Sequence, residues 1–231
     1  GGMKGSVPPS RISHGMASLG DAKRVVMFGG STGVSGTLPE TNLQDTWLFD
    51  TVNGWTLYPV NQSIVPKARM AHAMATLRAG TVVMYGGWAG VNSNEMFSDL
   101  WRFTSGIGWH LISPVGSFSG SRSADGSVVL PGPRDSHSMA QLGPDRVLMA
   151  FGYGVPWYLE DTWILSTEKR EGECKSRGTD DDGLIYRWTQ VISDLNGAPI
   201  RRIATAMAST DDSDAVHGSR KVIVYGGQLQ Q

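Results

Sequence analysis

The amino-acid sequence predicts an all-β protein in which a unit of four short strands is repeated, and three observations lead to this prediction. Short segments rich in Val, Ile, Trp, Tyr and Phe are bounded by Gly, Asp, Asn or Pro, which is typical of strands separated by turns. No stretch keeps the period of about 3.6 residues that an amphipathic helix requires. The same four segments return in the same order, so a repeat organises the fold.

The first segment of each unit carries an arginine and, three residues later, a histidine. It occurs at residues 11–16, 69–74 and 134–139, and in weaker form at 202–207, where Thr205 replaces the histidine. Its four arginines are Arg11, Arg69, Arg134 and Arg202. The small residues that alternation places on one face of the first unit are Ser13, Gly15 and Ala17. We expect this face where sheets converge and their backbones approach closely.

The second segment is apolar and ends in a pair of glycines. The pairs are Gly29 and Gly30, Gly86 and Gly87, and Gly226 and Gly227. The third unit departs from this pattern, because it keeps Gly152 and carries Tyr153 where the second glycine would stand. Glycine allows positive φ angles and leaves room for another backbone, so we expect close contacts at these strand ends.

Tryptophan marks the third and fourth segments. The third contains an Asp-x-Trp motif in three units, with the tryptophans Trp47, Trp101 and Trp163. The tryptophans of the fourth segment are Trp55, Trp109 and Trp188. We expect these large apolar side chains to fill the wider space between the outer parts of neighbouring sheets.

Four short strands per unit, repeated along the chain, form the pattern of a β-propeller blade. The Arg-x-x-His, Gly-Gly, Asp-x-Trp and lone Trp motifs, in this order, resemble the kelch-repeat family, which includes propellers of the galactose-oxidase type. The resemblance begins at Arg11 and implies about three and a half four-stranded blades. We expect residues 1–10 to be a tag or a preceding linker. The kelch segment is expected to span 11–231, with blades at 11–60, 69–113 and 134–193 and a half blade at 202–231.

The repeat count bears on whether the propeller is complete. Closed propellers need roughly four to eight blades, and an open one leaves strand edges and blade faces uncovered. We therefore expect the 231 residues to be a portion of a domain. The remaining blades would come from the same protein or from another chain.

One face of the predicted propeller carries aromatic residues outside the repeat pattern. In an antiparallel meander, the loops between second and third strands share a face with the loops that join blades, and we call this the loop face. Its candidate binding residues are Trp88, Trp157, Tyr153 and Phe97. Two interpretations stay open, because these rings either contact a partner or ligand or fold back to cap their own loops.

Composition excludes several classes of protein. A net charge of −1 argues against nucleic acid or an anionic membrane as the main partner. The apolar runs hold only a few residues, whereas a membrane-spanning helix needs roughly 20. The single cysteine excludes a disulfide framework and favours an intracellular compartment, although the glycosylation sequon at 61–63 keeps an extracellular one open.

No catalytic or metal-binding set stands out. His14, His72 and His137 could surround a channel and hold a metal ion, but they belong to the repeat pattern and the fourth unit has Thr205. Copper oxidases of this propeller type need a cysteine–tyrosine crosslink, and Cys174 lies in a charged insertion. The iron motif of plant specifier proteins is incomplete, because Phe103 stands where its histidine should be. We expect no metal and no cofactor.

The resemblance implies a non-catalytic module for protein–protein interaction, with the loop face as contact surface, within a larger protein. Two alternatives stay open. One is an enzyme or a propeller that binds a small ligand or carbohydrate on its aromatic loop face. The other is a purely structural propeller within a larger assembly.

Overall fold

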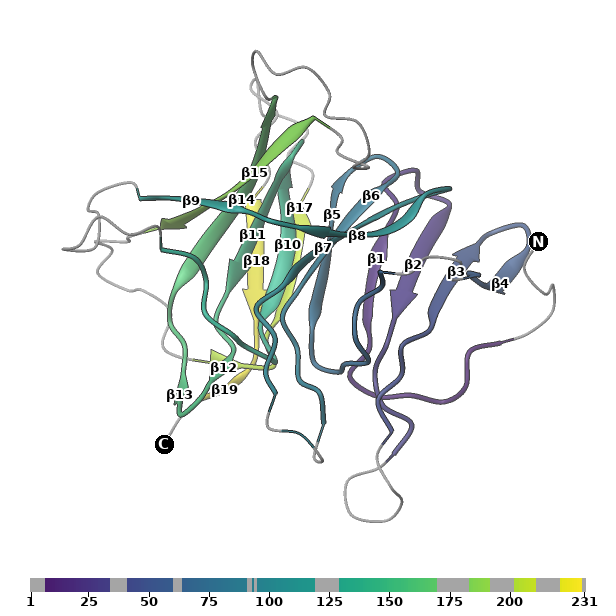
Figure 1. Cartoon of the computed structure of the whole chain (residues 1–231), viewed down its shortest axis with the longest axis horizontal. Coiled ribbons are helices and arrows are strands. Elements are labelled where there is room, and N and C mark those ends of the chain that lie inside the picture. Colours follow the sequence, from purple (N-terminus) through teal and green to yellow (C-terminus); the bar gives the residue numbers. More distant parts are fainter. Residues whose placement is uncertain are drawn as a thin grey trace.

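Strands are the only regular elements in the part of the chain that the structure describes (Figure 1). The computed structural model describes residues 7–33, 41–59, 64–90, 93, 95–118, 129–169, 183–191, 202–210 and 221–229. Within these ranges, no helix is long and apolar enough to cross a membrane. The predictions of an all-β fold and of a four-stranded unit are confirmed.

The first two units form regular antiparallel sheets in which each strand pairs with the next one along the chain. The strands of the first sheet are β1 (Gly15–Ser18), β2 (Arg24–Phe28), β3 (Thr46–Asp50) and β4 (Gly54–Leu57). Those of the second sheet are β5 (Ala73–Arg78), β6 (Thr81–Tyr85), β7 (Leu100–Thr104) and β8 (Gly108–Ile112). The Asp-x-Trp motif leads into the third strand of each sheet, and the lone tryptophan lies in the fourth.

The third unit adds one strand that the repeat does not predict. Its sheet has the order β10–β11–β14–β15–β9, and β9 pairs in parallel with β15. The strands are β10 (Ser138–Gly143), β11 (Arg146–Ala150), β14 (Thr162–Lys169), β15 (Leu184–Val191) and β9 (Val115–Phe118). A short hairpin of β12 (Tyr153–Gly154) and β13 (Trp157–Tyr158) lies between β11 and β14.

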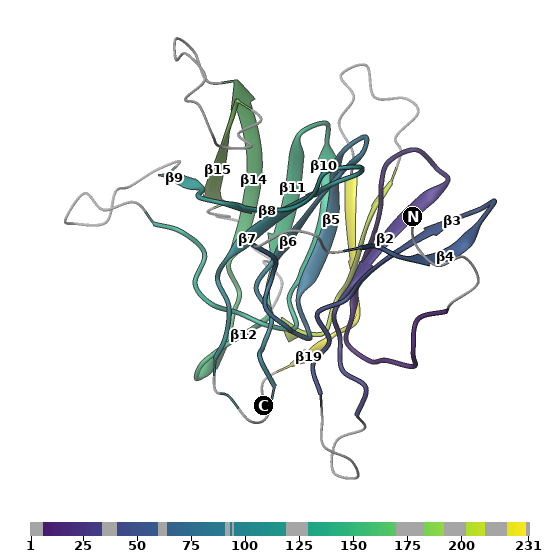
Figure 2. The same ribbon diagram turned by 45° about the vertical axis from the view of Figure 1, so that its right-hand side comes forward.

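The described part of the fourth unit is a two-stranded sheet. It consists of β17 (Ala206–Thr210) and β18 (Lys221–Tyr225), flanked by the small pair β16 (Arg202–Ile203) and β19 (Gln228–Leu229). Contacts run from β1 to β5, from β5 to β10 and from β10 to β17, so the first strands of successive units are neighbours. In Figures 1 and 2 these strands lie toward the middle, with β4 and β15 toward opposite sides.

An aromatic side chain at the end of the second strand joins each of the first two sheets to the next one. The Phe28 ring packs edge-on against His72 at 5.7 Å and Trp109 at 5.1 Å, both from the second sheet. Tyr85 makes the corresponding contacts with His137 and with Trp188, at 5.9 and 5.4 Å. The histidine and the lone tryptophan of one unit thus form an inter-sheet slot for the preceding unit.

A ladder of backbone hydrogen bonds links the units beside the slots. In each hydrogen bond of the ladder, the main-chain N–H of the residue before the histidine position donates to the carbonyl of the equivalent residue in the preceding unit. Each N···O distance is 2.8 Å. These residues are Ser13, Ala71, Ser136 and Ala204, with φ angles between 52° and 55°. A positive φ interrupts strand alternation, so the expectation that Ser13 shares a strand face with Gly15 and Ala17 is wrong. The strand begins only at Gly15.

The third unit departs from the repeat at a different residue from the one we expected. Ala150 pairs with Ser138, which is the register of Tyr85 with Ala73 in the second unit. The next residues, Phe151 and Gly86, also match, because the main-chain N–H of each donates to the carbonyl of the Asp-x-Trp aspartate in its own unit. Phe151 therefore stands at the first glycine position, with a φ of 66°. Gly152 holds the second position, and Tyr153 follows the pair.

Candidate functional site

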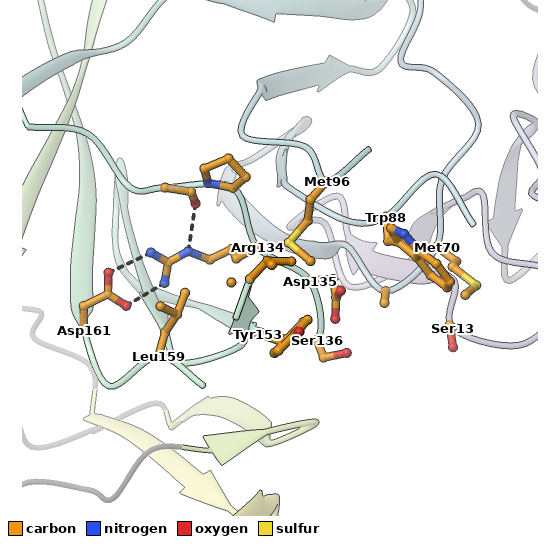
Figure 3. A pocket seen from close by; sticks show the side chains of 15 residues that line it. Ser13, Met70, Trp88, Met96, Arg134, Asp135, Ser136, Tyr153, Leu159 and Asp161 are labelled. Carbon is orange, nitrogen blue, oxygen red and sulfur yellow. Dashed lines mark hydrogen bonds and ion pairs between the residues drawn. The ribbon is translucent and has the colours of Figure 1, made fainter. Parts of the chain in front are cut away.

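A cavity of about 1170 Å³ opens at the junction of the second and third units (Figure 3). Its lining includes residues from both kinds of loop that we expected to share the loop face, and three residues of the backbone ladder, Ser13, Ala71 and Ser136. The lining residues used below are Ser13, Met70, Trp88, Met96, Arg134, Asp135, Ser136, Tyr153 and Asp161.

Trp88 and Tyr153 occupy the same position in successive units. The main-chain N–H of Trp88 donates to the Met70 carbonyl at 2.9 Å, and the Met70 N–H donates back at 3.0 Å. Tyr153 exchanges the same pair of hydrogen bonds with Asp135, at 2.8 and 3.0 Å. Backbone pairing therefore fixes where both aromatic side chains emerge. In the first unit the same position is Ser31, which is fully buried.

Arg134 stabilises the third-unit side of the cavity. Its guanidinium donates two hydrogen bonds of 2.7 Å to the Asp161 carboxylate and one of 3.1 Å to the Phe151 carbonyl. The Asp161 carboxylate also accepts a hydrogen bond of 2.6 Å from the indole of Trp163. Both charges are thus satisfied by the scaffold.

The same network recurs in the other complete units and explains why the arginine and the Asp-x-Trp motif occur together. Arg69 makes a two-pronged pair with Asp99 at 2.6 and 2.7 Å, and Arg11 pairs with Asp45 at 2.7 and 2.8 Å. We listed these arginines and tryptophans as repeat markers but missed the aspartates as their common partner. The signal was present, because the aspartate precedes the tryptophan by two residues in all three units.

Asp135 is the remaining acidic side chain of the cavity. Burial raises the pKa of its carboxyl group, and a hydrogen bond with Ser136 acts in the opposite direction. The ion pairs found among the described residues do not include it. Our reading of the sequence did not single out this residue.

The four candidate binding residues differ in their surroundings. Trp88 and Tyr153 line the cavity, both partly buried. Trp157, on β13, is 59% exposed, and the neighbouring hairpin residues Tyr153 and Tyr158 pack edge-on at 6.0 Å. Phe97 is buried, with the Arg69 guanidinium 4.0 Å from its ring centre. The structure therefore brings two of the four together at the cavity, with Phe97 beneath the surface.

The repeat histidines His72 and His137 are buried. Burial lowers the pKa of His72 to about 3 and that of His137 well below its ordinary value, so both rings are neutral at pH 7. Among the described residues, no three side chains of the His, Cys, Asp or Glu type are grouped to hold a metal ion. Cys174 and the sequon at 61–63 lie outside the described residues.

Comparison with known proteins places these repeats in a wider context. Residues 2–178 match the family model described as the KLHDC2/KLHL20/DRC7 Kelch-repeats domain. The chain is also similar to an F-box/kelch-repeat protein of Arabidopsis thaliana, with 24% identity over 235 residues. That alignment covers 98% of this chain but 42% of the relative, so the chain spans less than half of the relative's length.

Proposed function

The chain belongs to the kelch-repeat family, and from that premise we propose that it is a non-catalytic protein-interaction module that binds its partner at the loop-face cavity. Kelch-repeat domains generally act as protein–protein interaction modules. The observation that carries the proposal is the cavity between Trp88 and Tyr153, with the exposed Trp157 in the adjoining hairpin. Aromatic side chains are enriched where proteins bind one another tightly.

The cavity has the character of a contact surface on a rigid support. Hydrogen-bonded backbone pairs hold Trp88 and Tyr153, and the buried pair of Arg134 and Asp161 holds the strands behind them. A partner therefore meets preformed walls and does not have to order them, which reduces the entropic cost of binding. Phe97 is buried and stacks with the Arg69 guanidinium, so its ring is part of the rigid support and not of the contact surface.

We further propose that the chain acts within a larger protein, as its length relative to the plant relative suggests. A small-ligand or carbohydrate site is the competing use of the same cavity. At about 1170 Å³ the cavity is slightly larger than the roughly 300–1,000 Å³ of typical small-molecule pockets, so it has room for such a ligand as well. The two uses differ in Trp157, which lies outside the cavity lining and is accessible only to a partner that extends beyond it.

The test compares the proteins captured by the purified chain with those captured by Trp88→Ala and Trp157→Ala. We expect a partner that binds the wild type, and then binds again as a purified protein, to lose at least about tenfold in affinity with each variant. The control is Ile107→Ala, which removes an apolar side chain of similar exposure (55%) from the turn between β7 and β8. Partners that tolerate both tryptophan variants would overturn the proposal, and a protein partner that depends on Trp88 alone would restrict the contact surface to the cavity.

A further inference from the structure

Asp135 breaks the repeat at a position that is otherwise apolar. The residue between the arginine and the ladder residue is Ile12 in the first unit, Met70 in the second and Ile203 in the fourth. In the first three units this residue makes the same antiparallel bridge, and Asp135 makes it with Tyr153 through main-chain atoms alone. The scaffold therefore places no requirement on a carboxylate here.

The carboxylate of Asp135 lacks a basic partner among the described residues. Its neighbour Arg134 is committed to Asp161 and to backbone carbonyls, as described above. A carboxylate that leaves bulk water without a counter-charge destabilises the free protein, and the raised pKa of Asp135 reflects that cost. A positively charged group from outside would offset it.

The surroundings of Asp135 suit a cation carried on an apolar stem. In Figure 3, Asp135 lies along the cavity between Tyr153 on one side and Trp88 and Met70 on the other. Aromatic rings attract cations through their faces, and methionine side chains pack well against aliphatic carbon. The same chain already stacks a guanidinium on a ring, because Arg69 lies over Phe97 at 4.0 Å.

We propose that the loop-face cavity takes up a lysine or arginine side chain of the partner protein, with its charged group paired to Asp135 and its stem against Trp88 and Tyr153. This inference rests on the proposed function and adds the chemistry of the bound segment. Lysine and arginine combine an aliphatic stem with a charged end, so one side chain satisfies both the carboxylate and the apolar walls.

A random dodecapeptide library displayed on phage serves as the probe, and it is selected in parallel on the wild type, Asp135→Asn and Trp88→Ala. Asparagine keeps the shape of the side chain and removes its charge. Glu168→Gln is the matched control, because it removes an exposed carboxylate that pairs with Arg187 near the far end of β14. Thermal unfolding of each variant verifies that the fold is kept.

We expect peptides selected on the wild type and on Glu168→Gln to be enriched in lysine or arginine at one position. Synthetic copies should lose roughly 10- to 100-fold in affinity on Asp135→Asn, which corresponds to the loss of a hydrogen bond to a charged group. Their binding to the wild type should also weaken as ionic strength rises.

Two results would overturn the inference in distinguishable ways. Selected peptides that depend on Trp88 but show no basic enrichment, or bind Asp135→Asn equally well, would refute the role of Asp135 and leave the proposed function standing. If no selected peptide depends on Trp88, the interaction surface itself is wrong.

Discussion

Arg69 connects three parts of one unit through a single buried side chain. Its guanidinium pairs with Asp99, donates to the Gly86 carbonyl at 2.9 Å and stacks on Phe97. The side chain is fully buried, whereas the Asp99 side chain keeps 28% exposure. Burial raises the pKa of Asp99, but the hydrogen bonds and charge of Arg69 outweigh it, so the pKa lies below its ordinary value. The pair therefore stabilises the folded state at neutral pH.

Asp99→Asn should lower the free energy of unfolding by about 3 kcal/mol at pH 7, because it leaves the Arg69 charge buried without a counter-charge. Urea unfolding measures this. Glu95→Gln, which breaks the exposed pair with Lys67, should cost less than about 1 kcal/mol. Because the pKa of Asp99 is lowered in the folded state, the stabilisation by its ion pair is fully present above the unfolded-state pKa of about 3.9. This stabilisation is lost as the pH falls through the folded-state pKa. Equal losses for the two variants would contradict this account.

The ends of the second strands show how one element depends on the next. A Cβ atom at Gly86 would lie 2.5 Å from the Arg134 carbonyl and 2.9 Å from a ring carbon of His137, both in the following unit. Phe151 occupies the matching position of the third unit, and there the following unit carries Thr205 in place of histidine. Glycine occurs where the following unit has histidine, and phenylalanine occurs where it has threonine. We therefore expect the two departures from the repeat to compensate each other in part, with the Arg134 carbonyl still crowding a Cβ at Gly86.

Gly86→Ala and Gly80→Ala together separate crowding from backbone strain. Both glycines have positive φ, 66° and 75°, but a Cβ at Gly80 would meet nothing within 4 Å. Gly80→Ala should cost about 1–2 kcal/mol of unfolding free energy from its backbone conformation, and Gly86→Ala about 1–3 kcal/mol more from overpacking. Thermal and urea unfolding provide the measurement.

Adding His137→Thr to Gly86→Ala provides the control for this prediction. The double variant should recover part of the loss, as the third unit suggests, and a double-mutant cycle would quantify the coupling. Strictly additive effects of the two substitutions would contradict the proposed compensation.

Exposed apolar residues lie on the outermost sheets of the whole molecule. Tyr225 ends β18 as Phe28 and Tyr85 end β2 and β6, yet it is 80% exposed where they are at most 1% exposed. At the other end, the slot residues His14 and Trp55 are partly exposed, whereas Trp109 and Trp188 are buried. No described residue of the chain fills the first slot or covers Tyr225. The exposed ring and the open slot are therefore the same two halves that pack together at the inner junctions.

The isolated 231-residue chain should therefore self-associate, with Tyr225 of one copy entering the slot of His14 and Trp55 in another. Sedimentation velocity over a range of concentrations tests this. Tyr225→Ser should shift the distribution toward the monomer, whereas Ile107→Ser, at a site of 55% exposure, should leave it unchanged. A wild-type chain that stays monomeric at every concentration would contradict the prediction.

The sequence by itself determined the all-β class, the four-strand unit and the positions of the arginines, glycines and tryptophans. These features depend on neighbours within one unit, and repetition makes such local patterns visible. It also indicated the loop face, since the alternation of strand direction assigns loops to faces. The one-residue error at Phe151 arose because a glycine count cannot distinguish which of two adjacent positions changed. Only the hydrogen-bond register resolves this.

Only the tertiary structure decided which residues meet at the cavity. Asp135 and Tyr153 pair within the third unit, and backbone hydrogen bonds between units bring this pair beside Trp88 of the second unit. Asp135 did not stand out in the sequence, because nothing local signals that its carboxylate is partly buried and lacks a basic partner among the described residues. Burial and charge pairing depend on the packing of distant segments, and packing leaves no pattern in a single strand.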